Sequence, residues 1–359
     1  MLAALAWFAP TISTLAANDP IRPIANMFDP LGTPAKMIHD SSILVSIICL
    51  VIFIVVTAML VYVVIKFPSK GAEDEKKEPP QVYGSSQIEL AWTVIPILIT
   101  IVLILVTTRT IGEIQDKKLP NEALRVRVIG HQWWWELEYL KQDGVDKDGK
   151  PVWKRDFITA NELHIPVSDR NSTRPTQLIL ESVDVIHSYW VPQLNGKTDV
   201  VPNRTNHMWL DPWETGTYLG NCAEYCGTQH ANMLIRVIVQ TPEDFEKWCA
   251  AQRASVVEPP VGDALAVAGK KDYFANSCVS CHSIAGTVSR GVEGGVFGPD
   301  LTHFASRASF ASGMAPITLD NIRDWLRDPH HLKPGVLMPN MQLTDTEVDQ
   351  IAAYLMTLK

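Results

Sequence analysis

Two long apolar runs stand out near the start of the chain. Residues 43–65 carry no charged side chain, and residues 88–108 carry only Glu89 and include Pro96. A helix rises about 1.5 Å per residue, so each run can cross a hydrocarbon core of about 30 Å. Membrane helices tolerate an internal proline. We therefore predict a two-helix transmembrane hairpin over residues 37–113.

The loop between the two runs predicts the orientation of the hairpin. It carries four lysines, Lys66, Lys70, Lys76 and Lys77, and loops rich in lysine stay on the cytoplasmic side. Both ends of the hairpin, and the chain that follows it, then face outward. The N-terminal segment, residues 1–36, begins with an apolar stretch that fits either a cleaved signal or a retained arm.

Beyond residue 114 the pattern changes to that of β-strands. Residues 124–129 alternate apolar and polar positions, and two Asp-Gly pairs supply turn residues before residue 157. Further short strands are predicted at 162–165, 177–182, 206–210, 216–219 and 234–240. Short strands broken by Pro, Gly and Asn are typical of a Greek-key sandwich. We assign this all-β domain to residues 114–242.

The last third of the chain has a helical pattern. Thr241 followed by a proline and acidic residues predicts a helix start, and Glu258-Pro-Pro predicts a linker. Residues 243–262 are therefore predicted as a helix and linker. Residues 263–359 form a separate all-α module that ends in an amphipathic helix over 346–358.

Soft metal-binding side chains cluster in residues 221–233. They are Cys222, Cys226, His230 and Met233, a set that suits copper rather than magnesium or calcium. A mononuclear blue-copper site needs one cysteine, so the second thiol suggests a copper pair bridged by both sulfurs. His187, on an apolar strand-like segment, is the candidate for the second imidazole. A disulfide between the two cysteines and a zinc site are the alternatives.

The all-α module begins with a second metal motif. Cys278-Val-Ser-Cys281-His282 has the spacing that attaches c-type haem, with the histidine as one axial ligand. Cys-x-x-Cys also occurs as a thiol redox motif. A soft second axial ligand is expected far downstream, where Met338 and Met341 are both available. Other methionines usually fill apolar gaps.

The copper motif resembles a known family signature. Cys222-Ala-Glu-Tyr-Cys226-Gly with His230 and Met233, preceded by Asp184-Val-Ile-His187-Ser, resembles the binuclear copper (CuA) site of cytochrome c oxidase subunit 2. The resemblance implies a cupredoxin fold for the sandwich. It implies side-chain copper ligands at His187, Cys222, Cys226, His230 and Met233. It also implies that Glu224 gives its carbonyl to copper and its carboxylate to Mg²⁺ shared with subunit 1.

Two further residues receive roles through this resemblance. Residues 131–139 resemble the aromatic segment through which electrons enter, with Trp133 as the receiving residue and Trp134 where a tyrosine is usual. Three successive tryptophans in a strand face alternate sides, so we expect that not all three lie in the core. The stretch Glu89-Leu-Ala-Trp-Thr resembles one whose glutamate marks the entrance of a proton-uptake path. The alternative is a carboxylate that reaches the nearby membrane surface.

The C-terminal module resembles class I cytochromes c, in which the methionine of a Met-Pro pair precedes the last helix. This favours Met338 over Met341 as axial ligand. Hairpin, copper domain and haem domain together resemble subunit 2 of a caa3-type cytochrome c oxidase over nearly the whole chain. The resemblance implies a bacterial cytoplasmic membrane protein with its metal domains outside. Electrons then pass from covalent haem c to CuA and on to subunit 1, where oxygen is reduced to water and protons are pumped.

Partners follow from the same resemblance. Subunits 1 and 3 are expected, together with a donor such as a quinol–cytochrome c reductase, a small cytochrome or a cupredoxin. The net charge of −8 and the absence of a basic stripe argue against nucleic acid. A quinol oxidase subunit 2 is one rival, but it lacks the copper ligands. A membrane-anchored copper-delivery module with a haem domain is another, although delivery does not need a five-ligand set.

Overall fold

The structure is a computed structural model. It describes residues 26–68, 71, 78, 81, 83–115, 119–120, 122–168, 174–256, 258–287 and 298–359. The apolar N-terminal stretch, predicted as either a signal or a retained arm, lies outside the described residues. So do three lysines of the hairpin loop, Lys70, Lys76 and Lys77. One compact unit is Lys36–Lys118, and the other contains Leu119–Lys359 with the described residues before Lys36. The predicted domain boundaries stay predictions.

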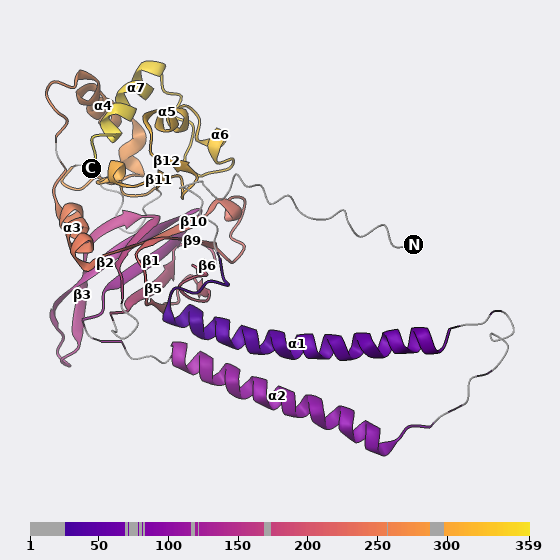
Figure 1. The fold of residues 1–359 in the computed structure, drawn as a ribbon. Coiled ribbons are helices and arrows are strands. Elements are labelled where there is room, and N and C mark those ends of the chain that lie inside the picture. Colours follow the sequence, from indigo (N-terminus) through magenta and orange to yellow (C-terminus); the bar gives the residue numbers. More distant parts are fainter. Residues whose placement is uncertain are drawn as a thin grey trace. The chain divides into compact units, whose positions relative to one another are not determined.

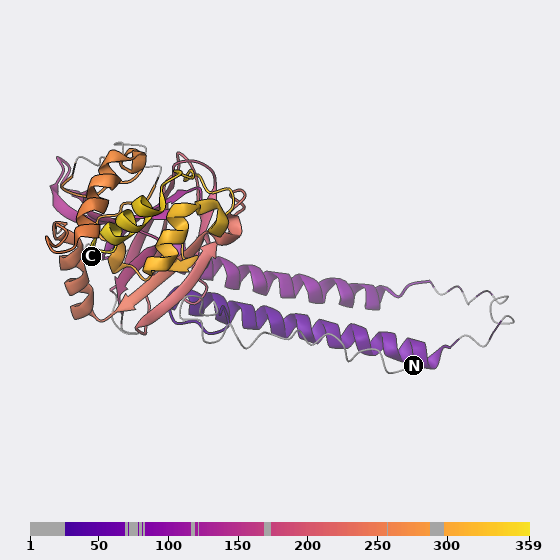
Figure 2. The ribbon, with the colours of Figure 1, turned by 90° about the horizontal axis from the view of Figure 1, so that it is seen from above.

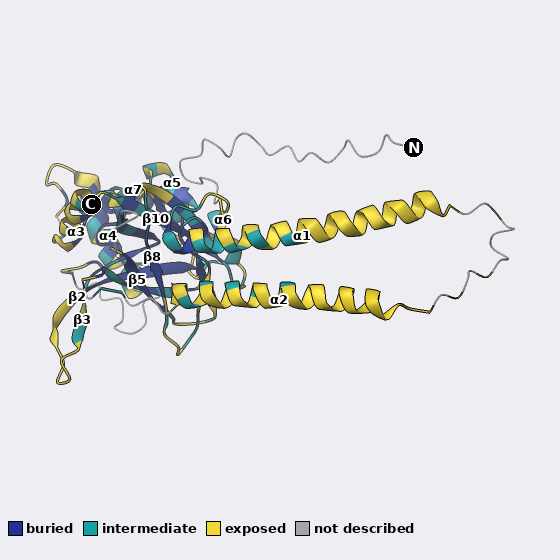
Figure 3. Cartoon of the chain, turned by 60° about the horizontal axis from the view of Figure 1, so that its bottom comes forward, coloured by how far each residue is buried: buried dark blue, intermediate teal, exposed yellow. Residues whose placement is uncertain are grey.

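The first unit is the predicted hairpin. α1 (Thr33–Lys66) and α2 (Ser86–Gln115) run side by side, and the Ser41 and Thr110 hydroxyls lie 3.0 Å apart (Figures 1 and 2). Both helices are long and apolar enough to cross a membrane. Most of their apolar residues are exposed rather than packed in a protein core (Figure 3). A lipid environment accounts for such a surface, because apolar side chains can remain exposed to hydrocarbon without the cost of contact with water.

The second unit contains a β-sandwich. Among the described residues, ten strands form two five-stranded sheets of order β3-β2-β1-β5-β8 and β4-β10-β9-β6-β7. The strands are β1 (Arg125–His131), β2 (Trp134–Val145), β3 (Pro151–Ala160), β4 (Glu162–Pro166), β5 (Thr176–Ser182), β6 (His187–Trp190), β7 (Thr198–Val200), β8 (Asn206–Leu210), β9 (Gly216–Cys222) and β10 (Leu234–Gln240). Alternate residues of these strands form one buried core. The predicted all-β fold is confirmed, and β7 is an additional strand.

The helix that follows the sandwich adds to the sandwich core. α3 (Pro242–Arg253) begins as predicted, with the Thr241 hydroxyl accepting a hydrogen bond from the Asp244 amide. The Trp248 ring stacks on the His164 ring at 4.1 Å. Phe245 and Cys249 are buried in the same core cluster as the strands. The helix therefore extends the sandwich rather than serving only as a connection.

The C-terminal domain, residues 263–359, has its own core. Its helices are α4 (Ala264–Ala275), α5 (Leu319–Arg327), α6 (Pro329–Leu332) and α7 (Asp345–Leu355). α4 and α7 approach closely at Gly269, where a Cβ atom would lie 1.8 Å from the Gln350 carbonyl oxygen. A short hairpin of β11 (Ser309–Phe310) and β12 (Ala315–Pro316) was not predicted. The last helix ends at Leu355, earlier than predicted.

Candidate metal centres

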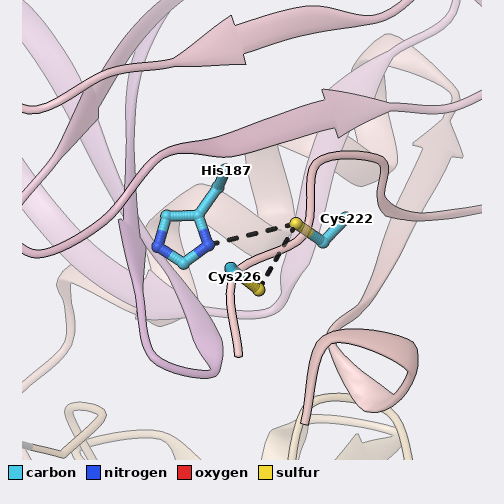
Figure 4. A group of neighbouring side chains, drawn as sticks. All are labelled: His187, Cys222 and Cys226. Atoms are coloured by element: carbon cyan, nitrogen blue, oxygen red, sulfur yellow. Dashed lines mark hydrogen bonds between the residues drawn. The ribbon is translucent and has the colours of Figure 1, made fainter. Parts of the chain in front are cut away.

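The five predicted copper ligands meet where β6, β9 and the loop before β10 come together. Figure 4 shows three of them, His187, Cys222 and Cys226. Cys222 Sγ lies 3.7 Å from Cys226 Sγ and 3.9 Å from His187 Nδ1. Cys226 Sγ lies 3.6 Å from His230 Nδ1 and 3.8 Å from Met233 Sδ. Each sulfur thus faces the other sulfur and one imidazole. A metal pair bridged by both thiolates needs this arrangement.

A sixth donor and the surroundings of the cluster suit soft metal ions. The Glu224 carbonyl oxygen is 3.2 Å from Cys222 Sγ, while the Glu224 carboxylate belongs to an exposed residue. Both cysteines are free, because their sulfur atoms are too far apart for a disulfide bond, which is about 2.05 Å long. The donor residues are largely shielded from water, with Cys222 at 1%, Cys226 at 3% and Met233 at 0% exposure. The set of two thiols, two imidazoles and a thioether fits copper better than zinc.

The two neighbouring thiols have different pKa values. The hydrogen bond between them lowers the pKa of Cys222 and raises the pKa of Cys226, because one thiolate is stabilised by the neighbouring thiol. Loading the site with metal therefore releases the remaining proton.

A second layer of polar contacts orients His187. Its Nε2–H donates to Asp184 Oδ1 at 2.8 Å, which leaves Nδ1 directed at Cys222. Burial lowers the pKa of His187, but the hydrogen bonds and charges of Asp184 and Cys222 together outweigh burial, and the pKa is raised. The backbone amide of Gln132 donates a hydrogen bond to Asp184 Oδ2 at 2.6 Å and so fixes that carboxylate. At Gly130 a Cβ atom would lie 2.7 Å from the His187 ring, so the glycine makes room for this orientation.

The three tryptophans lie beside this site, and all three are buried. Trp133, Trp134 and Trp135 are 7%, 8% and 1% exposed, and Trp133 and Trp135 belong to the core cluster of the sandwich. β1 ends at His131 and β2 begins at Trp134, so Trp133 lies in the turn. Trp134 is buried outside that cluster, where its ring stacks on the His131 ring at 4.1 Å, so not all three lie in the core, as expected. Trp133 Nε1–H donates to the Cys226 carbonyl at 2.9 Å.

The candidate haem attachment site lies at the end of α4. Cys278 and Cys281 are free and half-buried. His282 Nδ1–H donates to the Pro299 carbonyl at 2.8 Å, which leaves Nε2 as the ligand atom. A Cβ atom at Gly298 would lie 2.6 Å from the His282 ring. Burial lowers the pKa of His282 and favours the neutral imidazole that iron binds.

The other predicted residues lie apart from these clusters. Met338 and Met341 are both half-buried in a segment without helix or strand, so the two candidate axial ligands have the same burial class and backbone setting. Glu89 lies exposed in the first turn of α2, within the hairpin unit. Sequence reasoning missed Gln132, which also donates through Nε2 to the Cys226 carbonyl at 2.7 Å. It also missed Lys333, whose contacts join distant parts of the chain and leave no local signal.

Comparisons with known proteins identify the family of each part of the chain. Family models match for "Cytochrome C oxidase subunit II, transmembrane domain" at residues 30–109, "Cytochrome C oxidase subunit II, periplasmic domain" at 124–240 and "Cytochrome c" at 266–359. A cytochrome c oxidase subunit 2 of Alkalihalophilus pseudofirmus is 34% identical over 336 residues, covering 92% of this chain and 90% of the relative. That of Bacillus sp. strain PS3 is 32% identical, covering 80% and 78%.

A solved structure is also similar. It is the periplasmic domain of subunit II of cytochrome oxidase of Bradyrhizobium japonicum, which is 26% identical and has a TM-score of 0.31. The match covers 38% of this chain and 97% of that one.

Proposed function

Because this chain belongs to the cytochrome c oxidase subunit 2 family and carries a C-terminal cytochrome c domain, we propose that its two metal centres form one electron route. As a subunit 2 it is anchored in the membrane with its metal domains outside, and it assembles with subunit 1 of a haem–copper oxidase. Electrons pass from haem c to the binuclear copper and on to subunit 1, where oxygen is reduced to water.

The linked donor network around Cys222 and Cys226 carries the copper assignment. We assign the side chains of His187, Cys222, Cys226, His230 and Met233, and the Glu224 carbonyl, as copper ligands. A copper pair held by the Cys222 and Cys226 thiolates would supply a one-electron carrier. The chain keeps water away from the donors and fixes the His187 ring through Asp184. A rigid, dry ligand set changes little between oxidation states, which favours fast transfer.

The haem assignment rests on Cys278, Cys281 and His282. The two thiols would form the thioether links, and the hydrogen bond from Nδ1 to Pro299 would hold His282 Nε2 toward iron. We assign Met338 as the second axial ligand. The C-terminal domain carries eight Lys or Arg and ten Asp or Glu residues, so it lacks the basic face that steers many soluble cytochromes. A covalent tether supplies proximity without such steering.

The surface around the copper loop supports further assignments. Glu224 is exposed while its carbonyl faces Cys222, so its carboxylate is free to bind Mg²⁺ shared with subunit 1. Trp133 touches the Cys226 carbonyl and is assigned as the residue that receives electrons for the copper pair. The donor to haem c is assigned as a quinol–cytochrome c reductase, a small cytochrome or a cupredoxin, and subunit 3 as a further partner.

Glu89 is assigned to the entrance of a proton-uptake path into subunit 1. Its place in the first turn of α2 puts a carboxylate at the predicted cytoplasmic end of the hairpin. Glu89→Gln in the assembled oxidase is expected to slow turnover and proton uptake together. Unchanged proton uptake in a fully assembled Glu89→Gln oxidase would refute this role.

Paramagnetic resonance of the purified holoprotein tests the copper assignment against copper delivery. An unpaired electron shared by two copper nuclei gives a seven-line hyperfine pattern, whereas a delivery site bound as Cu(I) is silent. Metal and haem analysis of the same sample should give two coppers and one covalent haem per chain. A single copper per chain would overturn the proposal.

A further inference from the structure

The C-terminal domain buries a lysine against the copper loop. Lys333 is 2% exposed, and its Nζ donates to the carbonyl oxygens of Trp133 at 2.8 Å, Asn232 at 3.1 Å and Ala311 at 3.3 Å. An ammonium group has three N–H donors, so the charged form matches the three acceptors. Burial lowers the pKa of Lys333 to about 7, so the charge is costly to hold away from water.

The two residues after Lys333 continue the contact. The Pro334 carbonyl accepts a hydrogen bond from Gln229 Nε2. At Gly335 a Cβ atom would lie 3.2 Å from Thr228 Cγ2, so the backbone itself lies against the loop. Lys333–Gly335 therefore contacts segment 228–232, which contains the copper ligand His230. Gly335 lies three residues before Met338, the assigned haem ligand.

A second buried charged group also joins the two domains. This one belongs to the sandwich and is bound by the C-terminal domain. Glu162 of the sandwich is 1% exposed. It accepts hydrogen bonds from the Ala308 amide at 2.9 Å and from the Ser309 amide and hydroxyl at 2.9 and 2.7 Å. Each domain thus buries one charged group that the other domain helps to solvate: two of the three Lys333 acceptors belong to the sandwich, and all the Glu162 donors named here belong to the C-terminal domain. Such a contact is favourable in one register only, because a shifted charge would lose its partners.

The chain between these anchors holds an unfavourable backbone conformation. Ala311 and Ser312 have φ of 50° and 65°, a left-handed region that costs free energy for residues other than glycine. Leu234 of the sandwich donates its amide to the Ser312 carbonyl at 3.3 Å. The Ala311 carbonyl is one of the Lys333 acceptors. The sandwich therefore helps to hold the conformation that completes the lysine site.

We propose that Lys333 is a positioning residue for electron transfer: it docks the haem domain on the copper loop in one register and places a positive charge beside the copper pair. This inference rests on the proposed copper and haem centres. Lys333 Nζ donates a hydrogen bond to the Trp133 carbonyl, and the Trp133 side chain donates through Nε1 to the Cys226 carbonyl. One short path of bonds therefore joins the haem domain to a copper ligand. A nearby cation favours the reduced copper pair and raises its reduction potential.

The test compares Lys333→Met with Lys271→Met, an exposed lysine of the same domain, in the assembled oxidase below pH 7. Redox titration of the copper absorption should show a lower potential in Lys333→Met. The haem–copper electron equilibrium should move three- to tenfold toward haem c, where tenfold corresponds to about 59 mV. Flash-triggered transfer from haem c to copper should slow at least tenfold. Lys271→Met should match the wild type in both measurements.

The Lys333→Arg variant distinguishes the effect of the positive charge on the copper potential from the effect of docking geometry on the transfer rate. Arginine keeps the cation but its planar fork cannot reproduce three ammonium bonds, so the copper potential should stay near the wild-type value while the transfer rate falls. The inference is overturned if Lys333→Met, with full copper and haem, keeps both potential and rate. It is also overturned if Lys333→Arg lowers the potential as much as Lys333→Met does. Absence of a copper pair from the wild type would instead refute the proposed function.

Discussion

The two candidate metal centres of this chain are built in different ways. In the copper site neighbouring donor atoms lie 3.2–3.9 Å apart, and three of the donor residues are at most 1% exposed. In the haem site Cys278, Cys281 and Met338 are half-buried, and they lie in segments without regular helix or strand apart from one short turn. A metal pair is held by donors that converge, whereas a haem is held by residues that stay on different sides of a large apolar ring. The first site is thus shaped by the protein core, and the second is completed by its prosthetic group.

Removing haem attachment should have the largest effect. In a Cys278→Ser/Cys281→Ser double variant we expect loss of covalent haem, loss of electron delivery and loss of a stable C-terminal domain, because haem binding contributes to folding free energy. Limited proteolysis of the full chain should cut the C-terminal domain and spare the sandwich. A protease-resistant C-terminal domain without haem would show that its own core is enough to keep it folded. The two metal centres would then not differ in how far their domains depend on the bound group.

Removing a copper ligand should abolish turnover but spare the fold. Cys226→Ser should eliminate the shared-spin signal. Its sandwich core is made by apolar side chains of both sheets, so the metal-free variant should unfold within about 2 kcal/mol of the metal-free wild type. Denaturant unfolding of the two proteins measures this. A much larger loss of stability would mean that the sandwich, like the C-terminal domain, depends on its metal.

Changing the partner of a ligand should have a moderate effect. Asp184→Asn keeps the shape of the side chain but weakens the bond that orients His187. Copper affinity should fall about 10- to 100-fold, measured by competition with a chelator. Asp199→Asn is a matched control, since Asp199 is exposed in the neighbouring strand β7. An equal loss of affinity in the control would show that general surface charge, and not His187 orientation, is responsible.

Choosing between the two methionines should have the smallest effect. Met338→Leu should lower the reduction potential of haem c, because a thioether axial ligand favours the reduced iron. Met341→Leu should leave the potential unchanged. Redox titration of the haem absorption band compares them. The reverse result would move the ligand to Met341 and lengthen the segment between haem and the copper loop.

Much of the fold was predictable because its signals are local. The hairpin follows from two uninterrupted apolar runs, and the helix start at Thr241 follows from its capping chemistry. The last strands were predicted within a few residues, but the short strand β7 and the β11–β12 hairpin were not, since two or three residues carry too little pattern. Strand alternation predicted that not all three tryptophans lie in the core, but it did not predict the turn at residues 132–133 that interrupts the strand.

The sequence by itself determined which side chains could bind copper and haem, because ligand type and spacing are chemical properties of short segments. Tertiary structure alone decided what surrounds those ligands. Lys333 and Trp133 are 200 positions apart along the chain, yet they share a hydrogen bond. Such a contact depends on how two domains with separate cores meet, and no periodicity or motif near either residue encodes that meeting.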